Sequence, residues 1–249
     1  MLSYQLYSSR NFPPLGDTLR MLADLGYDGA EGFGGLYTDR ASLAELAAGL
    51  KATGLNMHSG HFGLDQVEQT PDWAIEVAQT LGMAQVIVPW IHPDMRPTDA
   101  AGWRALGARL QKAGAPVVAA GLKFGWHNHD FEFIPLPCGT IPQTALFEGG
   151  PDLAWEMDVA WALRGGADPL AWIDAHKHRI IAAHVKDIAP AGENLTEDGW
   201  ADVGHGTVPW AQIMPALRAI GVDNFVMEHD NPSDHARFAA RALASAKTF

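Results

Sequence analysis

Two histidines and two acidic residues interrupt an apolar, aromatic stretch near the middle of the chain, "FGWHNHDFEF" (Phe124 to Phe133). These four polar residues are His127, His129, Asp130 and Glu132. Burying a polar group without a partner is costly, so a buried strand rarely carries four of them. A turn or a surface edge explains one or two. A metal or substrate site at the end of the strand explains all four.

Polar residues also interrupt or follow other short apolar stretches. Asp158 lies in "AWEMDVAW", His184 lies in "AAHVKD", and Glu228 directly follows "FVM". Other residues at the expected strand ends are Glu31, His58, His61, Trp90, His92, Glu156, Lys186, Asp187, His229 and Asp230. Imidazoles and carboxylates without thiolates suit a divalent metal such as Mn, Co, Mg or Zn. A single histidine at a strand end is usually structural, but three such residues on successive strands favour a functional site.

A weak repeat indicates which elements position these residues. Segments such as "LRMLADLGYDGAEGFG" and "IMPALRAIGVDNFVMEHD" share one order. Each has a helix-period stretch, a glycine where the helix would stop, and a short apolar stretch that ends in polar residues. Glycine just past a helix is the usual left-handed cap. Short apolar stretches of this kind are typical of strands in a parallel sheet that is buried on both faces.

The pattern predicts strands near residues 2–6, 28–33, 55–58, 85–89, 123–128, 153–158, 181–185 and 225–228, and a final helix over about 234–246. Eight strands alternating with helices in 249 residues indicate an α/β fold, a single-domain (β/α)8 TIM barrel over residues 1–249. A doubly wound open sheet is the alternative, but "GGLY" at Gly34 to Tyr37 lacks the spacing of a phosphate-binding turn. In a barrel, the polar strand ends meet at one rim.

The composition argues against several classes of protein. The net charge of -12 opposes binding to nucleic acid, and the single cysteine, Cys138, excludes an internal disulfide or a cysteine-based zinc cluster. The first residues, "MLSYQLYSSR", lack the features of a signal peptide, and no apolar stretch approaches a membrane span. We expect a cytoplasmic protein that has no membrane partner. The oligomeric state is left open, and a homo-oligomer is compatible with these features.

The sequence resembles the sugar phosphate isomerase/epimerase family of the xylose isomerase-like TIM barrel superfamily. The matching pieces, in order, are "GWHNHDFEF", "WEMDVAW", "RIIAAHVKD", "DVGHGTVPWAQIMPAL" and "FVMEHD", with a weaker match at "SGHFG". They cover roughly the C-terminal half. Together they are specific to the superfamily, although not to one activity.

The resemblance implies one divalent metal ion held by four side chains from strands five to eight. It carries over directly onto Asp158, His184 and Glu228. Many relatives have a glutamate ligand on strand five, where this chain has His127. Either His127 replaces that carboxylate, or Glu132 reaches the metal from the loop. Because side chains alternate along a strand, both cannot serve without a local bend.

Relatives of this kind bind a sugar or polyol through two adjacent oxygens, and a carboxylate removes a proton next to the polarised carbonyl to give an enediolate. The resemblance therefore implies a metal-dependent isomerase or epimerase of a carbohydrate. Glu228 and Glu132 are the candidate bases, and Lys186 would stabilise negative charge. The candidate substrate-binding residues are His58, His92, Trp90, His129 and Trp161.

Three alternatives remain at this stage. A lyase or dehydratase acting on a keto-sugar or keto-glycoside shares the first proton transfer. A phosphodiesterase similar to endonuclease IV would need more metal ligands and a DNA-binding rim, which the acidic charge disfavours. A non-catalytic sugar-binding barrel without metal would not need Asp158, His184 and Glu228.

Overall fold

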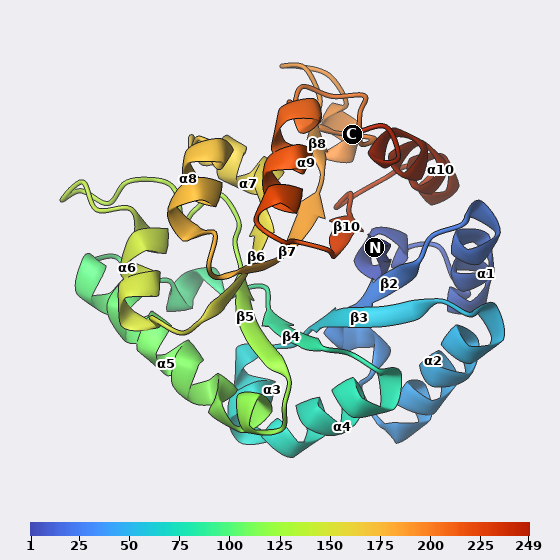
Figure 1. Cartoon of the computed structure of the whole chain (residues 1–249), viewed down its shortest axis with the longest axis horizontal. Helices are drawn as coiled ribbons and strands as arrows, with labels where there is room; N and C mark the ends of the chain where they lie inside the picture. Colours follow the sequence, from blue (N-terminus) through green and yellow to red (C-terminus); the bar gives the residue numbers. More distant parts are fainter.

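Eight parallel strands close into a barrel whose order around the ring is β1-β10-β7-β6-β5-β4-β3-β2 (Figure 1). The computed structural model describes residues 1–249. The barrel strands are β1 (Leu2–Gln5), β2 (Gly29–Gly32), β3 (Asn56–His61), β4 (Gln85–Val88), β5 (Lys123–His127), β6 (Ala154–Asp158), β7 (Ile180–Val185) and β10 (Phe225–Met227). The closed barrel and its strand count confirm the predicted fold.

Helices cover the outside of the barrel, as Figure 1 shows. The α-helices are α1 (Leu15–Leu25), α2 (Arg40–Thr53), α3 (Leu64–Gln69), α4 (Pro71–Leu81), α5 (Ala100–Ala119), α6 (Pro142–Gly149), α7 (Val159–Arg164), α8 (Pro169–His176), α9 (Trp210–Ala219) and α10 (His235–Ala246). Four short 3-10 helices are η1 (Leu6–Ser9), η2 (Gly34–Leu36), η3 (Pro93–Met95) and η4 (Leu195–Glu197). Helix α10 confirms the predicted final helix.

Glycines end several helices and turn the chain toward the next strand. Helices α1, α2 and α4 stop at Gly26, Gly54 and Gly82, whose φ angles are 90°, 74° and 74°. Glycine adopts this left-handed conformation without a steric penalty, so the helix stops and its last carbonyls find new donors. The repeated order of helix, glycine and strand is therefore a structural feature of the barrel.

The largest difference from the predicted elements is in β3, which runs to His61 instead of ending at residue 58. Its last residues are "SGH", which look like a turn because they are small and polar. Ser59, Gly60 and His61 nevertheless pair with consecutive residues of β4. His61 thus takes the end of the strand, and His58 lies three residues further back.

The interior of the barrel is polar, whereas most barrels fill this space with branched apolar side chains. Ser3 donates to Asn224 over 3.0 Å, and Asn224 donates to Ser59 over 3.1 Å. Ser59 in turn donates to Glu31. Because β3 is not a neighbour of β10 in the ring, the bond from Asn224 to Ser59 crosses the barrel interior. A hydrogen-bonded column thus leads along the interior toward the carboxyl ends of the strands.

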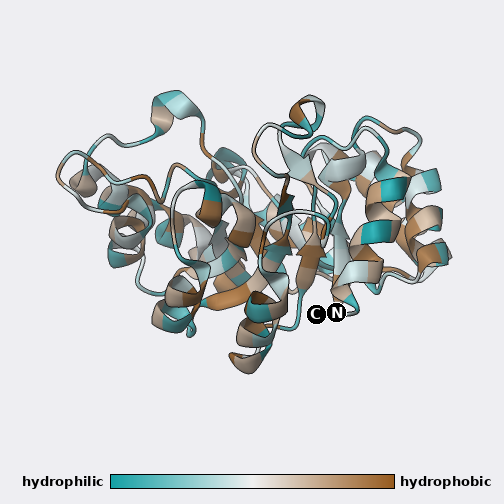
Figure 2. Cartoon of the chain, turned by 90° about the horizontal axis from the view of Figure 1, so that it is seen from above, coloured by the Kyte–Doolittle hydropathy of each residue, from teal (hydrophilic) through white to brown (hydrophobic).

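The loops are longer at the carboxyl end of the barrel. In Figure 2 the chain ends lie on the lower side, hydrophobic colouring appears on the central strands and on parts of the surrounding helices, and loops extend above. The longest of these loops contains the antiparallel pair β8 (Asp187–Ile188) and β9 (Trp200–Ala201). None of the helices combines the length and the apolar character needed to cross a bilayer.

Candidate metal centre and substrate pocket

Seven buried residues gather at the carboxyl ends of β3, β5, β6, β7 and β10, and we refer to them as the strand-end cluster. Its members are His61, His127, Glu156, Asp158, His184, Lys186 and Glu228. Alternation along each strand explains the spacing: residues two apart, such as Glu156 and Asp158 on β6, face the same side. His61 of β3 lies 2.7 Å from Glu156 of β6, and these strands are not neighbours. The cluster therefore occupies the interior of the barrel.

Four members of the cluster offer ligand atoms that all lie within 4.8 Å of one another: His127, Asp158, His184 and Glu228. His184 Nδ1 lies 2.8 Å from Glu228 Oε2. His127 Nε2 lies 3.9 Å from Asp158 Oδ2, which is too far for a hydrogen bond, and Asp158 Oδ2 is buried without a partner. Two atoms that bind one ion at roughly 2.1 Å each lie at most about 4.2 Å apart. The separation and the donor types therefore fit a divalent metal.

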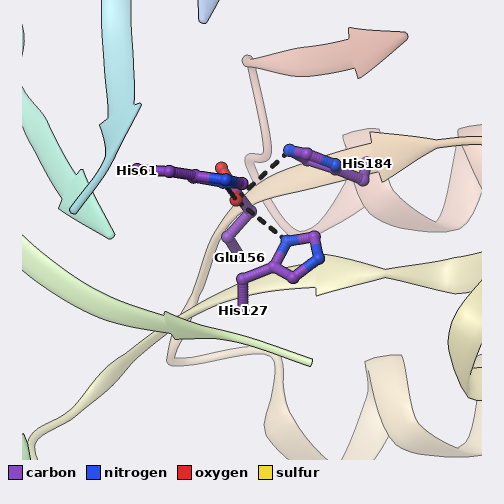
Figure 3. Close-up of side chains that lie close together, drawn as sticks. All are labelled: His61, His127, Glu156 and His184. Carbon is purple, nitrogen blue, oxygen red and sulfur yellow. Dashed lines mark hydrogen bonds and ion pairs between the residues drawn. The ribbon is translucent and has the colours of Figure 1, made fainter. Parts of the chain in front are cut away.

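A second group lies deeper and shares two of these histidines. Figure 3 shows the Glu156 carboxylate among the imidazoles of His61, His127 and His184. Glu156 Oε2 lies 2.7 Å from His61 Nε2, 3.0 Å from His127 Nδ1 and 3.2 Å from His184 Nε2. Their ligand atoms also lie within 4.8 Å of one another. In contrast to the first group, every one of these nitrogens already faces a carboxylate oxygen at hydrogen-bonding distance.

Lys186 follows β7 and is fully buried among carboxylates. Its ammonium donates to both oxygens of Asp230 over 2.8 Å and lies 3.3 Å from Glu228 and 3.6 Å from Asp158. It also lies 4.4 Å from the ring centre of Trp200. Burial by itself lowers the pKa of Lys186, but the three carboxylates raise it above its usual value. The side chain is therefore cationic at neutral pH.

The carboxylates near Lys186 titrate differently. Burial raises the pKa of Asp158 to about 6, and the charges of Lys186 and His184 only partly oppose that effect. Burial acts in the same direction on Glu228, but Lys186 and His184 outweigh it and hold the pKa of Glu228 well below its usual range. Both groups are anionic at neutral pH, so they can bind a cation or accept a proton.

A cavity of about 590 Å³ opens onto the cluster and has a largely aromatic wall. His61, His127 and Glu228 form its floor, and Trp90, His129 and Trp161 contribute to its sides, together with Tyr7, Phe33 and Phe62. Aromatic rings of this kind pack against the apolar faces of sugar rings. Burial lowers the pKa of His129 to about 3, so its imidazole is neutral. Trp90, His129 and Trp161 thus lie where the sequence predicted substrate contacts.

Two other predicted substrate residues lie elsewhere. His58 is near Asp223, Lys123 and the N-terminal amine, which places it at the amino end of the barrel. That prediction was wrong because β3 is three residues longer than its apolar stretch indicated. His92 is exposed on the loop after β4, where it accepts a hydrogen bond from the Asp94 amide and packs edge-on against Trp90, 5.7 Å between ring centres. It does not line the cavity.

Glu132 is not placed to bind the metal or to act as a base in this cavity. Its carboxylate accepts hydrogen bonds from Trp126 Nε1 over 3.2 Å and from the His129 amide over 2.9 Å. Trp126 and Phe124 lie on the face of β5 opposite His127, and Phe124 packs against Gly114 of α5. Glu132 therefore lies behind the strand, between barrel and helices. Of the two alternatives for strand five, the geometry leaves His127 as the candidate ligand.

Sequence reasoning assigned no role to three buried residues in or beside the cluster: Glu31, His61 and Glu156. Glu31 Oε1 lies 2.7 Å from His184 Nε2 and 3.1 Å from His61 Nε2. A signal was present, because Glu31 and Glu156 both stand inside short strands where solvent cannot hydrate them. The contacts from Glu31 to His184 and from Glu156 to His61 join non-neighbouring strands, which a sequence pattern does not identify.

A second polar group, which we call the loop network, lies beside the cluster in the segments after β7 and β10 and surrounds two buried carboxylates, those of Glu197 and Asp202. Its members are Glu197, Asp202, Ser233, Arg237 and Arg241. Glu197 accepts from Arg237 over 3.0 Å and from the Ser233 amide over 3.0 Å. Asp202 accepts from Arg237 over 3.0 Å and from Arg241 over 3.1 Å. Both carboxylates therefore have cationic partners.

Comparison with known proteins agrees with this architecture. The sequence profile of the xylose isomerase-like TIM barrel family matches residues 19–247. The chain belongs to this family. No functionally curated protein matches its sequence significantly.

Solved structures with the family fold superpose over nearly the whole chain at low sequence identity. A sugar phosphate isomerase/epimerase from Parabacteroides distasonis is 20% identical, with a TM-score of 0.81 over 98% of this chain and 92% of that one. The probable 3-DHS dehydratase AsbF from Bacillus anthracis is 15% identical, with a TM-score of 0.78 over 99% and 98%. The IOLI protein, solved with a bound zinc atom, is 16% identical, with a TM-score of 0.73 over 99% and 95%.

Proposed function

We propose that this protein is a divalent-metal-dependent enzyme that isomerises or epimerises a sugar, keto-sugar or polyol by proton transfer next to a carbonyl. The observation that carries the proposal is the 3.9 Å separation of His127 Nε2 from Asp158 Oδ2, where His127 lies on the floor of the aromatic cavity and Asp158 Oδ2 is a buried oxygen without a hydrogen-bond partner. The structural likeness to an isomerase/epimerase and to a zinc-containing protein supports it.

The residues that would hold the metal are His127, Asp158, His184 and Glu228. Two imidazoles and two carboxylates suit Mn, Co or Zn, and Mg to a lesser extent because it prefers oxygen ligands. When bound, such an ion supplies a Lewis acid that polarises a substrate carbonyl and acidifies the neighbouring C–H bond.

Glu228 is the candidate general base. It lines the cavity and is anionic at neutral pH, so it can accept a proton from a bound substrate. The Lys186 ammonium lies 3.3 Å from Glu228 Oε2 and stabilises negative charge that develops on the substrate. Return of the proton to the other face gives an epimer, and return to the neighbouring carbon gives an isomer.

The walls of the cavity would orient the substrate. Trp161 and His129 stand together, with ring centres 5.2 Å apart, and Trp90 lies on the cavity wall with 43% of its surface exposed. The rings provide apolar contact for the C–H faces of a sugar, and the neutral imidazole of His129 can exchange hydrogen bonds with hydroxyl groups.

Dehydration of a keto-sugar is the second candidate, because it begins with the same proton transfer. The positive charge of the buried Lys186 ammonium, next to Glu228, would stabilise the negative charge of a departing hydroxyl group. The structural likeness to a probable dehydratase also favours keeping this candidate. Product analysis separates the two, because dehydration changes the mass of the product and epimerisation does not.

The test is proton exchange in deuterated water with a panel of ketoses and 3-keto-glycosides, followed by NMR and mass spectrometry. We expect the metal-loaded protein to place deuterium on the carbon next to the carbonyl. Glu228→Gln and Lys186→Met should each slow this exchange about a hundredfold or more. His58→Gln, at the other end of the barrel, is the control and should exchange normally. Conversion of a substrate without exchange, or normal exchange by Glu228→Gln, would contradict the proposal.

A further inference from the structure

The two ligand histidines each present one nitrogen to the proposed metal and the other to a deeper carboxylate. His184 Nδ1 lies 2.8 Å from Glu228, whereas its Nε2 lies 2.7 Å from Glu31 Oε1. His127 Nε2 faces Asp158 over 3.9 Å, whereas its Nδ1 lies 3.0 Å from Glu156 Oε2 (Figure 3). Both rings therefore separate a set of metal-facing atoms from a layer of carboxylates behind them.

Glu31 is also held in place by two neutral hydrogen-bond donors, one on the oxygen that faces His184 and one on the other oxygen. Gln5 Nε2 donates to Glu31 Oε1 over 2.7 Å, and Ser59 Oγ donates to Oε2. Ser59 is itself fixed by a 3.1 Å hydrogen bond from Asn224. All of these side chains are buried, with no more than 1% of their surface exposed. The carboxylate thus has a fixed position behind the imidazole.

We infer that Glu31 and Glu156 are positioning residues that select the tautomer and ring orientation of His184 and His127 for metal binding. This inference rests on the proposed function. A carboxylate that accepts the N–H of one ring nitrogen leaves the lone pair of the other nitrogen directed at the ion. It also makes that nitrogen a better electron donor. Gln5 and Ser59, which belong to the polar interior of the barrel, fix the Glu31 carboxylate and so act on the metal site through it.

The experiment measures Zn²⁺ affinity by chelator competition and the d–d absorption spectrum of the Co²⁺-loaded protein. Glu31→Gln should weaken Zn²⁺ binding about 10-fold, and Glu31→Ala up to about 100-fold. Both should shift the Co²⁺ spectrum, which a change in global stability alone does not do. Ser59→Ala keeps Glu31 but removes one of its hydrogen-bond donors, so it should reduce the Zn²⁺ affinity by less than the Glu31 variants do. This variant still tests the inference if the Glu31 variants do not fold.

Glu132→Gln is the matched control, because Glu132 is equally buried but contacts none of the four ligands. Its Zn²⁺ affinity and Co²⁺ spectrum should equal those of the wild type. Wild-type affinity and spectrum in folded Glu31→Gln would overturn the inference while the proposed function stands. Two Zn²⁺ per wild-type chain would also overturn it, because the second ion would take the nitrogens that face Glu31 and Glu156. A wild-type protein that takes up no metal would overturn both proposals.

Discussion

The strand-end cluster and the loop network both contain buried carboxylates, and both lie at the carboxyl end of the barrel, but the partners of these carboxylates differ. In the loop network, the carboxylates of Glu197 and Asp202 are paired with Arg237. In the strand-end cluster, Asp158 Oδ2 and Glu156 Oε1 are buried without any hydrogen-bond partner. Unpaired buried acceptors are costly in a folded protein, and a bound ion is one way to satisfy them.

The contrast indicates a division of roles. The loop network has the features of a structural set of ion pairs: each carboxylate has an arginine partner, and the pairs join the segments after β7 and β10. The strand-end cluster contains the cation of Lys186, but it still has buried carboxylate oxygens without hydrogen-bond partners, and its donor atoms could hold a metal ion. Asp187, which follows Lys186 of the cluster in the sequence, also has its hydrogen bonds satisfied. Its carboxylate accepts from the amides of Gly204 and Val208 over 2.8 Å and 3.0 Å, so we group it with the structural contacts. Gly206 also fits closely there, because a Cβ at that position would lie 2.3 Å from Asp187 Oδ1.

The largest stability effect is expected from Arg237→Ala in the loop network. It removes the cation shared by Glu197 and Asp202 and leaves two buried carboxylates short of partners. Because Arg237 is about one-third exposed, we expect a loss at the lower end for broken buried pairs, about 3 kcal/mol. Urea unfolding measures the loss, while Zn²⁺ affinity should stay at the wild-type value. A large fall in affinity of the folded variant would show that the two regions are not separate.

Glu132 sharpens the comparison because it has hydrogen bonds but no cationic partner. Burial raises its pKa to about 8, and the donors Trp126 and His129 only partly counter that effect. Since the pKa in the folded state lies above that in the unfolded state, the stabilising contribution is complete below about pH 4.3 and is lost as pH rises toward 8.

We therefore expect the free energy of unfolding of the wild type to fall, relative to that of Glu132→Gln, by about 1–2 kcal/mol between pH 5 and 7. Urea unfolding of both proteins at each pH, with the same metal present, gives the difference. Parallel curves for the two proteins would mean that Glu132 is ionised in the fold and that its two hydrogen bonds outweigh burial.

The sequence was sufficient for the fold because the relevant signals are local. Short apolar strands alternate with helices that end at glycines such as Gly26, Gly54 and Gly82. Few folds other than a barrel produce this alternation. Side-chain alternation and the common rim then bring His127, Asp158, His184 and Glu228 together. Asp158, His184 and Glu228 were predictable because each interrupts or ends an apolar stretch, whereas His127 was named as a possible ligand only through the family resemblance.

The remainder of the site depends on contacts across the barrel. Glu31 meets His184, and His61 meets Glu156, across non-neighbouring strands, and a pattern along one strand does not reveal these contacts. His61 was also obscured by a strand whose last residues are small and polar, which led to His58 instead. Glu132 was misplaced because a loop after β5 folds it behind the strand, where it meets Trp126.

The most direct test of the central claim is the metal content of the protein purified without chelator, compared with that of an Asp158→Ala, His184→Ala double variant. Elemental analysis should find about one divalent transition metal per wild-type chain and essentially none in the variant, with circular dichroism confirming that the variant is folded. A wild-type protein that contains no metal and takes up neither Mn²⁺ nor Zn²⁺ would contradict the account. So would a folded double variant that binds metal as the wild type does.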